Sequence, residues 1–218
     1  MAVTSEHDSP ATNELLARAA DGDRRSLGVL LERDRDRLRR MVALRMDRRL
    51  SGRVDPSDVI QEAQIEAVER LGEFLRNPTM PFFLWLRLIT GQRLMGVHRR
   101  HLGAKMRSAE REVSLYRGAL PEATSAALAA QLLGHATAPS QAAVRAEVKV
   151  RLQEALNAMD PLDREVLSLR HFEQLSTAEA ARELGISDEA TRKRHVRALK
   201  RLKEALGRSP GGPEEFAP

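Results

Sequence analysis

The 218-residue sequence contains no cysteine, which excludes disulfides, thiolate zinc sites and cysteine-based redox sensing. Aromatic residues make up only 3% of the chain, so we expect hydrophobic cores built from leucine, valine, isoleucine and alanine. The N-terminus has no apolar stretch of the kind that a secretion signal needs. The longest uncharged run, residues 123–144, is interrupted by polar residues and proline, which argues against a membrane span. These absences predict a cytoplasmic protein without a membrane partner.

The sequence also lacks the residue patterns of common catalytic sites. It has no metal-binding cluster of carboxylates, no glycine-rich phosphate loop and no nucleophile–base pair. His98 and His101 are three residues apart, but arginines flank both and no carboxylate or cysteine stands nearby to complete a metal site. We therefore predict a protein that is not an enzyme and that carries no metal or cofactor.

What the sequence does contain is helical periodicity and an excess of basic residues. The net charge of +5 and the pI near 10.2 favour a polyanionic partner without identifying it. The length fits two small helical domains better than one large core. We predict an all-α fold in which a flexible linker joins two small domains, the second with a helix-turn-helix. The expected boundaries are a disordered N-terminus at 1–11, a first domain at 12–108, a linker at 109–139, a second domain at 140–207 and a disordered tail at 208–218.

The clearest local signal lies between residues 174 and 203. Ser176 and Glu179 have the spacing of a capping box, so a short helix is expected to begin there. Gly185 is the expected end of that helix, and Ser187 followed by two acids starts a second one. The charges that follow are all basic, namely Arg192, Lys193, Arg194, Arg197, Lys200, Arg201 and Lys203. Two helices joined by a glycine turn, the second one basic, favour a DNA-binding helix-turn-helix over the solvated face of an ordinary helical hairpin.

Three helices are expected before residue 76. Thr12 is a candidate cap for the first helix, and the second is expected to run to about Leu50. Asp55 ahead of a proline is a strong start signal for the third helix, which reaches about Leu75. The outer side of this helix holds Asp58, Gln61, Glu62, Glu66 and Glu69. Two interpretations stand: the acidic face serves solubility, or it docks a basic protein surface.

A fourth helix is expected over residues 82–101, in a stretch without acidic residues. Basic residues are interleaved with aromatic ones in and around this helix, a composition that suits a single nucleic-acid strand held by its phosphates and stacked through its bases. Phe82 and Phe83 fit core positions, whereas Trp85 fits a core position and a stacking position equally well.

The segment between the two domains changes to alanine, leucine, glycine, serine and proline, a composition typical of a linker. Within it, residues 128–133 are suited to a helical turn or two. Beyond it, Ser140 and Asp160 are expected to open two further helices that complete the second domain with the helix-turn-helix.

Three stretches together carry a family resemblance. They are Asp58-Val-Ile-Gln-Glu-Ala, Trp85-Leu-Arg-Leu-Ile-Thr-Gly-Gln-Arg-Leu, and the run from Leu162-Asp-Arg-Glu-Val-Leu to the basic helix. In this order and spacing, residues 12–207 resemble the sigma-70 class of bacterial RNA polymerase sigma factors, specifically its small two-domain extracytoplasmic-function group. The resemblance implies a subunit that binds core RNA polymerase, recognises promoters and directs transcription initiation.

The resemblance also implies a role for each predicted surface. The acidic helix would bind the clamp helices of core polymerase through Asp58, Gln61, Glu62 and Glu66. The helix at 82–101 would recognise the −10 element and capture its melted non-template strand through Trp85, Gln92, Arg93, Arg99 and Arg100. The basic helix would enter the major groove of the −35 element, in double-stranded promoter DNA, through Arg192, Lys193, Arg194 and Arg197. An anti-sigma protein is a further partner that the resemblance admits.

The sequence departs from the family pattern at several positions. Gln92 stands where many members carry asparagine, although its amide can still hydrogen-bond the edge of a flipped base. Thr191 stands where a buried valine is usual. Gly91 and Gly96 lie inside the promoter-melting helix, where each costs about 0.5–1 kcal/mol relative to alanine, so this helix is expected to be soft or closely packed. The linker is also longer than a minimal one.

Three other classes of protein remain as alternatives. A stand-alone helix-turn-helix transcription regulator would use the second domain but leave the two faces of the first domain unexplained. An enzyme acting on nucleic acid would need a catalytic site that the sequence does not offer. A helical adaptor would not need the basic charges of Arg192 and Arg194.

Overall fold

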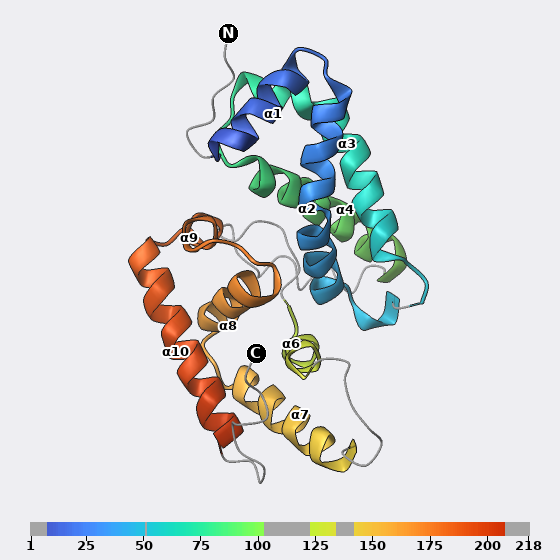
Figure 1. The fold of residues 1–218 in the computed structure, drawn as a ribbon. Coiled ribbons are helices and arrows are strands. Elements are labelled where there is room, and N and C mark those ends of the chain that lie inside the picture. Colours follow the sequence, from blue (N-terminus) through green and yellow to red (C-terminus); the bar gives the residue numbers. More distant parts are fainter. Residues whose placement is uncertain (1–7, 51, 103–122, 134–141, 208–218) are drawn as a thin grey trace. The chain divides into compact units, whose positions relative to one another are not determined.

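The computed structural model describes residues 8–50, 52–102, 123–133 and 142–207, with the backbone alone for 142–145 (Figure 1). Every regular element in these ranges is a helix, so the predicted all-α fold is confirmed. The first seven residues and the expected tail at 208–218 lie outside the described part of the chain. The chain divides into two compact units, residues 1–121 and residues 122–218.

The first unit is built from α1 (Pro10–Ala20), α2 (Arg24–Arg45), a 3₁₀ turn η1 (Arg48–Leu50), α3 (Pro56–Arg76) and α4 (Phe82–Leu102). Helices α2, α3 and α4 pack against one another, and α1 packs on α2. Each helix contributes fully buried side chains to this core, among them Leu16, Leu38, Ile60 and Leu86. Helix α4 is the most deeply enclosed, because buried residues occur on most sides of it.

The third helix starts where the sequence predicts. The carboxylate of Asp55 accepts a hydrogen bond from the backbone N–H of Ser57 at 2.7 Å, and a proline follows the cap directly. The predicted cap of the first helix was wrong by three residues. Ser9 caps α1 by accepting from the backbone N–H of Thr12 at 3.2 Å, and Thr12 itself is buried in the first turn.

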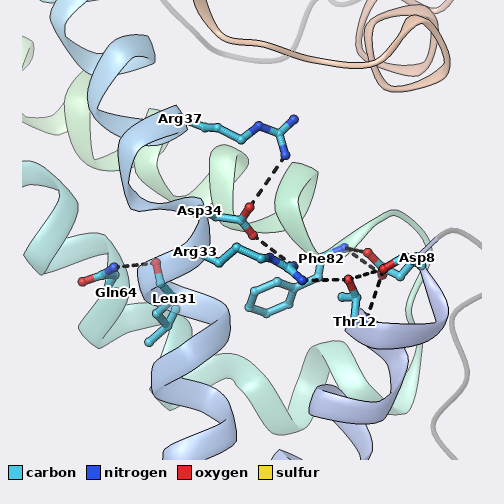
Figure 2. A network of polar contacts seen from close by, with 9 residues as sticks. Asp8, Thr12, Leu31, Arg33, Asp34, Arg37, Gln64 and Phe82 are labelled. Atoms are coloured by element: carbon cyan, nitrogen blue, oxygen red, sulfur yellow. Dashed lines mark hydrogen bonds and ion pairs between the residues drawn. The ribbon is translucent and has the colours of Figure 1, made fainter.

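Residues 8–11, which the sequence places in a disordered terminus, are ordered. The carboxylate of Asp8 accepts from the backbone N–H of Phe82 at 2.9 and 3.1 Å, at the first residue of α4 (Figure 2). A helix N-terminus offers unpaired N–H donors and a partial positive charge, which a carboxylate satisfies. Beside this contact, Arg33 donates to the hydroxyl of Thr12 at 3.1 Å. The N-terminal segment is therefore tied to α1, α2 and α4.

Helix α2 ends at Arg45, whereas the sequence predicts an end near Leu50. The backbone N–H of Asp47 donates to Nε2 of His98 on α4 at 3.3 Å, and the chain continues as the 3₁₀ turn. His98 is only 2% exposed, so it links two helices inside the unit. Among the described residues, no group of three or more histidine, cysteine, aspartate or glutamate side chains is arranged to hold a metal ion.

The second unit contains α6 (Ser125–Leu132), α7 (Ala142–Asn157), α8 (Pro161–Leu167), a π-helical turn η3 (Ser168–Phe172), α9 (Thr177–Leu184) and α10 (Asp188–Gly207). Asp160 caps α8 by accepting from the backbone N–H of Leu162 at 2.8 Å, as predicted. Ser140, the expected start of α7, lies outside the described residues. Helix α6 is longer than the predicted turn or two and packs on α7 with Leu128 buried, so it belongs to the second unit.

Candidate nucleic-acid interface

The predicted helix-turn-helix is formed by α9 and α10. Ser176 Oγ accepts from the backbone N–H of Glu179 at 3.1 Å, while the Glu179 carboxylate accepts from the backbone N–H of Ser176 at 2.6 Å. This reciprocal pair is a complete capping box. Gly185 ends α9 at φ +64°, a backbone conformation that favours glycine. Ser187 then caps α10 by accepting from the backbone N–H of Ala190 at 3.1 Å, which fixes the turn between the two helices.

Helix α10 has a clear inner and outer face. Thr191, Ala198 and Leu202 are buried against the rest of the unit. The exposed residues of its middle and C-terminal turns are six bases, two aliphatic residues, one acid and the last glycine, namely Arg192, Lys193, Val196, Arg197, Leu199, Lys200, Arg201, Lys203, Glu204 and Gly207. An exposed helix face with this charge is suited to the phosphates and base edges of a DNA groove.

The four predicted DNA contacts on α10 do not share one environment. Arg192 is exposed, and the Lys193 ammonium pairs with Glu189 at 2.6 Å in a contact whose two side chains are 72% and 68% exposed. Such an open pair is screened by water and contributes little, so it leaves Lys193 available to another anion. Arg194 and Arg197 instead face α8, where both contact the buried carboxylate of Asp163.

The predicted strand-binding residues of α4 also divide into two groups. Trp85 is only 8% exposed and stacks on Phe74 with ring centroids 4.6 Å apart. Of the two roles that the sequence allowed, a core position and a base-stacking position, its side chain therefore has the core position in this structure. Gln92, Arg99 and Arg100 are exposed.

Gly96 lies between these exposed residues and leaves room beside the helix backbone. A Cβ atom added at Gly96 would lie 4.0 Å from the guanidinium nitrogen Nη2 of Arg99 and 4.0 Å from Nη1 of Arg100. The guanidinium groups of Arg99 and Arg100 therefore lie close to the same point on the surface of α4, where Gly96 has no side chain. Paired guanidiniums offer several N–H donors to a phosphate, which suits this part of α4 to a nucleic-acid backbone.

The acidic face of α3 contains an exposed apolar pair that sequence reasoning missed. Asp58, Gln61 and Glu62 are exposed as expected. Ile65 and Val68, which are 56% and 49% exposed, lie within helical reach of them. The signal was present in the sequence, because both residues fall out of phase with the buried stripe of α3. A surface that combines acids with exposed aliphatic side chains is typical of a protein interface.

Glu66, the fourth predicted residue of this face, is held inside the unit. Its carboxylate contacts Nε of Arg93 on α4 at 2.5 Å and Nη1 of Arg70 at 3.0 Å, and it is 18% exposed. Burial on its own would raise the pKa of Glu66, but the hydrogen bonds from Arg93 and Arg70 lower it below its usual value. Glu66, predicted to bind protein, and Arg93, predicted to bind DNA, are thus paired with each other in the structure.

Comparison with known proteins agrees with this geometry. Residues 149–202, which include the helix-turn-helix, match the family described as "Sigma-70, region 4". Together with the basic outer face of α10, this match identifies a sigma-70 region 4 in the second unit.

The chain is 29% identical over 192 residues to the ECF RNA polymerase sigma factor SigD of Mycobacterium tuberculosis, covering 88% of this chain and 82% of that protein. It is also 44% identical over 55 residues to the RNA polymerase sigma-E factor of Streptomyces antibioticus, covering 25% of this chain and 31% of that protein. A solved structure, "Structure of CnrH in complex with the cytosolic domain of CnrY", has a similar fold at a TM-score of 0.50 and 23% identity, covering 90% of this chain and 97% of that one.

The chain carries a sigma-70 region 4 in its second unit and is similar over 88% of its length to an ECF RNA polymerase sigma factor. It is a sigma factor whose partners are RNA polymerase and promoter DNA, and it directs promoter recognition and transcription initiation. Homology to sigma factors implies a non-enzymatic transcription factor. The stand-alone regulator is not favoured, because the SigD match spans both units. In the ranges that the structure describes, no helix is long and apolar enough to cross a membrane.

Proposed function

We propose that α10 enters the major groove of the −35 element with its outer face. The observation that carries this assignment is the basic, exposed surface of the second helix of a helix-turn-helix, with Arg192 and Lys193 in its first half. Arginine can read guanine through paired hydrogen bonds, and lysine can hold a phosphate. Val196, which is 66% exposed on the same face, offers the methyl groups that pack on a thymine methyl.

We further propose that the exposed side of α4 binds the melted non-template strand of the −10 element. Gln92 supplies an amide for a base edge, and Arg99 with Arg100 supplies guanidiniums for phosphates. The buried Trp85 supports this helix from the core rather than through a base contact. Arg93, paired with Glu66, orients α4 on α3.

The outer face of α3 is proposed to bind the clamp helices of core polymerase. Asp58, Gln61 and Glu62 supply the polar contacts, and Ile65 with Val68 supplies apolar area at the centre of the interface. Glu66 is left out of this contact set because its carboxylate is already paired.

The remaining expectations complete the proposal. The first unit corresponds to sigma region 2, for which the sequence gives residues 12–108, and the second to sigma region 4, for which it gives residues 140–207. The described part of the intervening segment is α6, which packs on α7. The site of action is the cytoplasm, where RNA polymerase and the chromosome are found. An anti-sigma protein is a further proposed partner, supported by the solved chain of similar fold that is in complex with the cytosolic domain of another protein.

Run-off transcription tests the proposal with purified core polymerase, the full-length chain and a pool of promoter fragments. Initiation that depends on the chain and occurs on a subset of fragments is expected. DNA binding without initiation would instead support the stand-alone regulator.

Two charge changes then separate the proposed surfaces. Glu62→Lys should weaken binding to core polymerase, whereas Glu32→Lys, an equal charge reversal at a 75% exposed position on α2, should not. Arg192→Ala should lower −35 binding, and Lys149→Ala on α7 serves as the matched control in the same unit. Equal effects of a variant and its control would overturn the assignment of that surface.

A further inference from the structure

Asp163, in the first turn of α8, is a carboxylate with no exposed surface. A charge removed from water must be paired, because its lost hydration is otherwise uncompensated. Both partners of Asp163 come from α10. Nη1 of Arg194 donates a hydrogen bond to Oδ1 at 2.6 Å, whereas Nε of Arg197 lies 3.2 Å from Oδ2 in an ion pair without hydrogen-bond geometry. One buried carboxylate therefore holds two arginines that are three residues apart on the proposed DNA-reading helix.

The two arginines are held differently. Nη1 of Arg194 also contacts the carboxylate of Asp160 at 3.2 Å, and its side chain is only 25% exposed. Arg197 contacts Asp163 through Nε alone and is 51% exposed. Its two terminal amino groups are thus separate from the contact and can face outward. An arginine in this setting can bind guanine O6 and N7 end-on through Nη1 and Nη2.

We propose that Asp163 is a positioning residue for promoter recognition, which fixes Arg194 as an anchor of α10 and orients Arg197 to read a guanine in the −35 element. The inference rests on the proposed function of α10. It also divides the basic residues of this helix by role. Arg194 sets how α10 lies on α8, and Arg197 is a specificity-determining residue whose side-chain direction depends on an acid from another helix.

Base preference in transcription from a pool of promoters with a randomised −35 region tests this assignment. The full-length chain is combined with core polymerase, and the selected sequences give the relative use of each base at each position. This ratio does not depend on how much of the protein is active, because a folding defect lowers initiation from all templates alike. A purely structural role of Asp163 would therefore leave the ratio unchanged.

Four chains are compared: the wild type, Asp163→Asn, Arg197→Ala and Asp160→Asn. Arg197→Ala should relax a guanine preference at one or two positions by about fivefold or more. Asp163→Asn should relax the preference at the same positions, and the double substitution should add nothing further. Asp160→Asn is the matched control, because it removes one negative charge beside Arg194, leaves the Arg197 contact intact and keeps a residue that caps helices well. It should keep the wild-type preference.

The outcomes separate this inference from the proposed function. No initiation by the wild-type chain would contradict the proposed function itself. Normal initiation with an unchanged base preference in Asp163→Asn would overturn the positioning role alone. If Asp163→Asn gives no transcripts from any template, Arg197→Lys takes its place, since lysine keeps the charge but lacks the planar pair of donors. An unchanged preference in that variant would remove Arg197 as a reader and overturn the inference.

Discussion

Replacing Gly96 with alanine should stabilise the first unit. Gly96 lies in the interior of α4, where glycine is less favourable than alanine by about 0.5–1 kcal/mol. The added Cβ would meet no atom closer than 4.0 Å, and the nearest atoms are the ends of the flexible Arg99 and Arg100 side chains. No clash offsets the gain, so the free energy of unfolding should rise by the full helix-propensity difference. For a unit of this size, the unfolding midpoint should rise by about 2–8 °C.

The chain has a built-in probe for this measurement. Trp85 is its only tryptophan and is packed in the core of the first unit, so tryptophan fluorescence reports the unfolding of that unit. Urea denaturation followed by fluorescence should show a midpoint higher by about 0.3–0.7 M for an m-value near 1.5 kcal/mol/M. Gly22→Ala is the opposing control, because Gly22 has a φ of +92° that alanine adopts only with strain. A lower midpoint for Gly96→Ala would refute the reasoning and show that Arg99 and Arg100 cannot move aside.

Three further predictions follow from the second unit. Ser176→Ala removes one half of the capping box and should cost about 1 kcal/mol, visible in the circular dichroism transition but absent from the tryptophan transition of the first unit. Replacing thymine by uracil in the −35 element removes the methyl group that Val196 is proposed to contact. At one position this replacement should lower the affinity of the wild-type chain for the DNA, and it should not lower the affinity of the Val196→Ala variant. Burial lowers the pKa of His171 and of His195, whose Nε2 atoms are 2.8 Å apart, and the nearby Arg170 lowers both further. The folded state therefore binds fewer protons than the unfolded state below the ordinary histidine pKa of about 6.5, so the melting temperature should fall from about pH 7.5 to about pH 5.5, and His171→Phe should reduce that fall.

Most features that depend on neighbouring residues in the chain were predictable from the sequence, although the cap of α1 is Ser9 and not the predicted Thr12. The capping box of Ser176 with Glu179 and the glycine turn at Gly185 involve residues only a few positions apart, and the structure confirms them. The cap at Asp55 is local in the same sense. The overall fold class follows from such signals, because each one marks the start or end of a helix.

Two of the errors arise because a distant residue provides the partner. Helix α2 stops early because the backbone of Asp47 donates to His98, 51 positions further along the chain. The N-terminal segment is ordered because Asp8 caps α4 at Phe82, 74 positions away. Neither contact leaves a mark on the local sequence pattern. The same limit applies to the interface, where the basic residues of α10 are evident but the acid that holds two of them lies on α8.

Arg93 and Arg194 each pair with an acid, and the burial of that acid decides whether the arginine can leave it to bind DNA. Glu66, which holds Arg93, is 18% exposed, and Arg93 itself is 40% exposed, so water can reach both groups and a phosphate can replace the Glu66 carboxylate as the partner of Arg93. Asp163, which holds Arg194, has no exposed surface. Withdrawing Arg194 would leave a buried carboxylate with only the contact from Arg197, and breaking a buried pair costs about 3–5 kcal/mol, more than a single phosphate contact returns. Arg194 should therefore remain on α8 when the protein binds DNA, while Arg93 is free to exchange its partner.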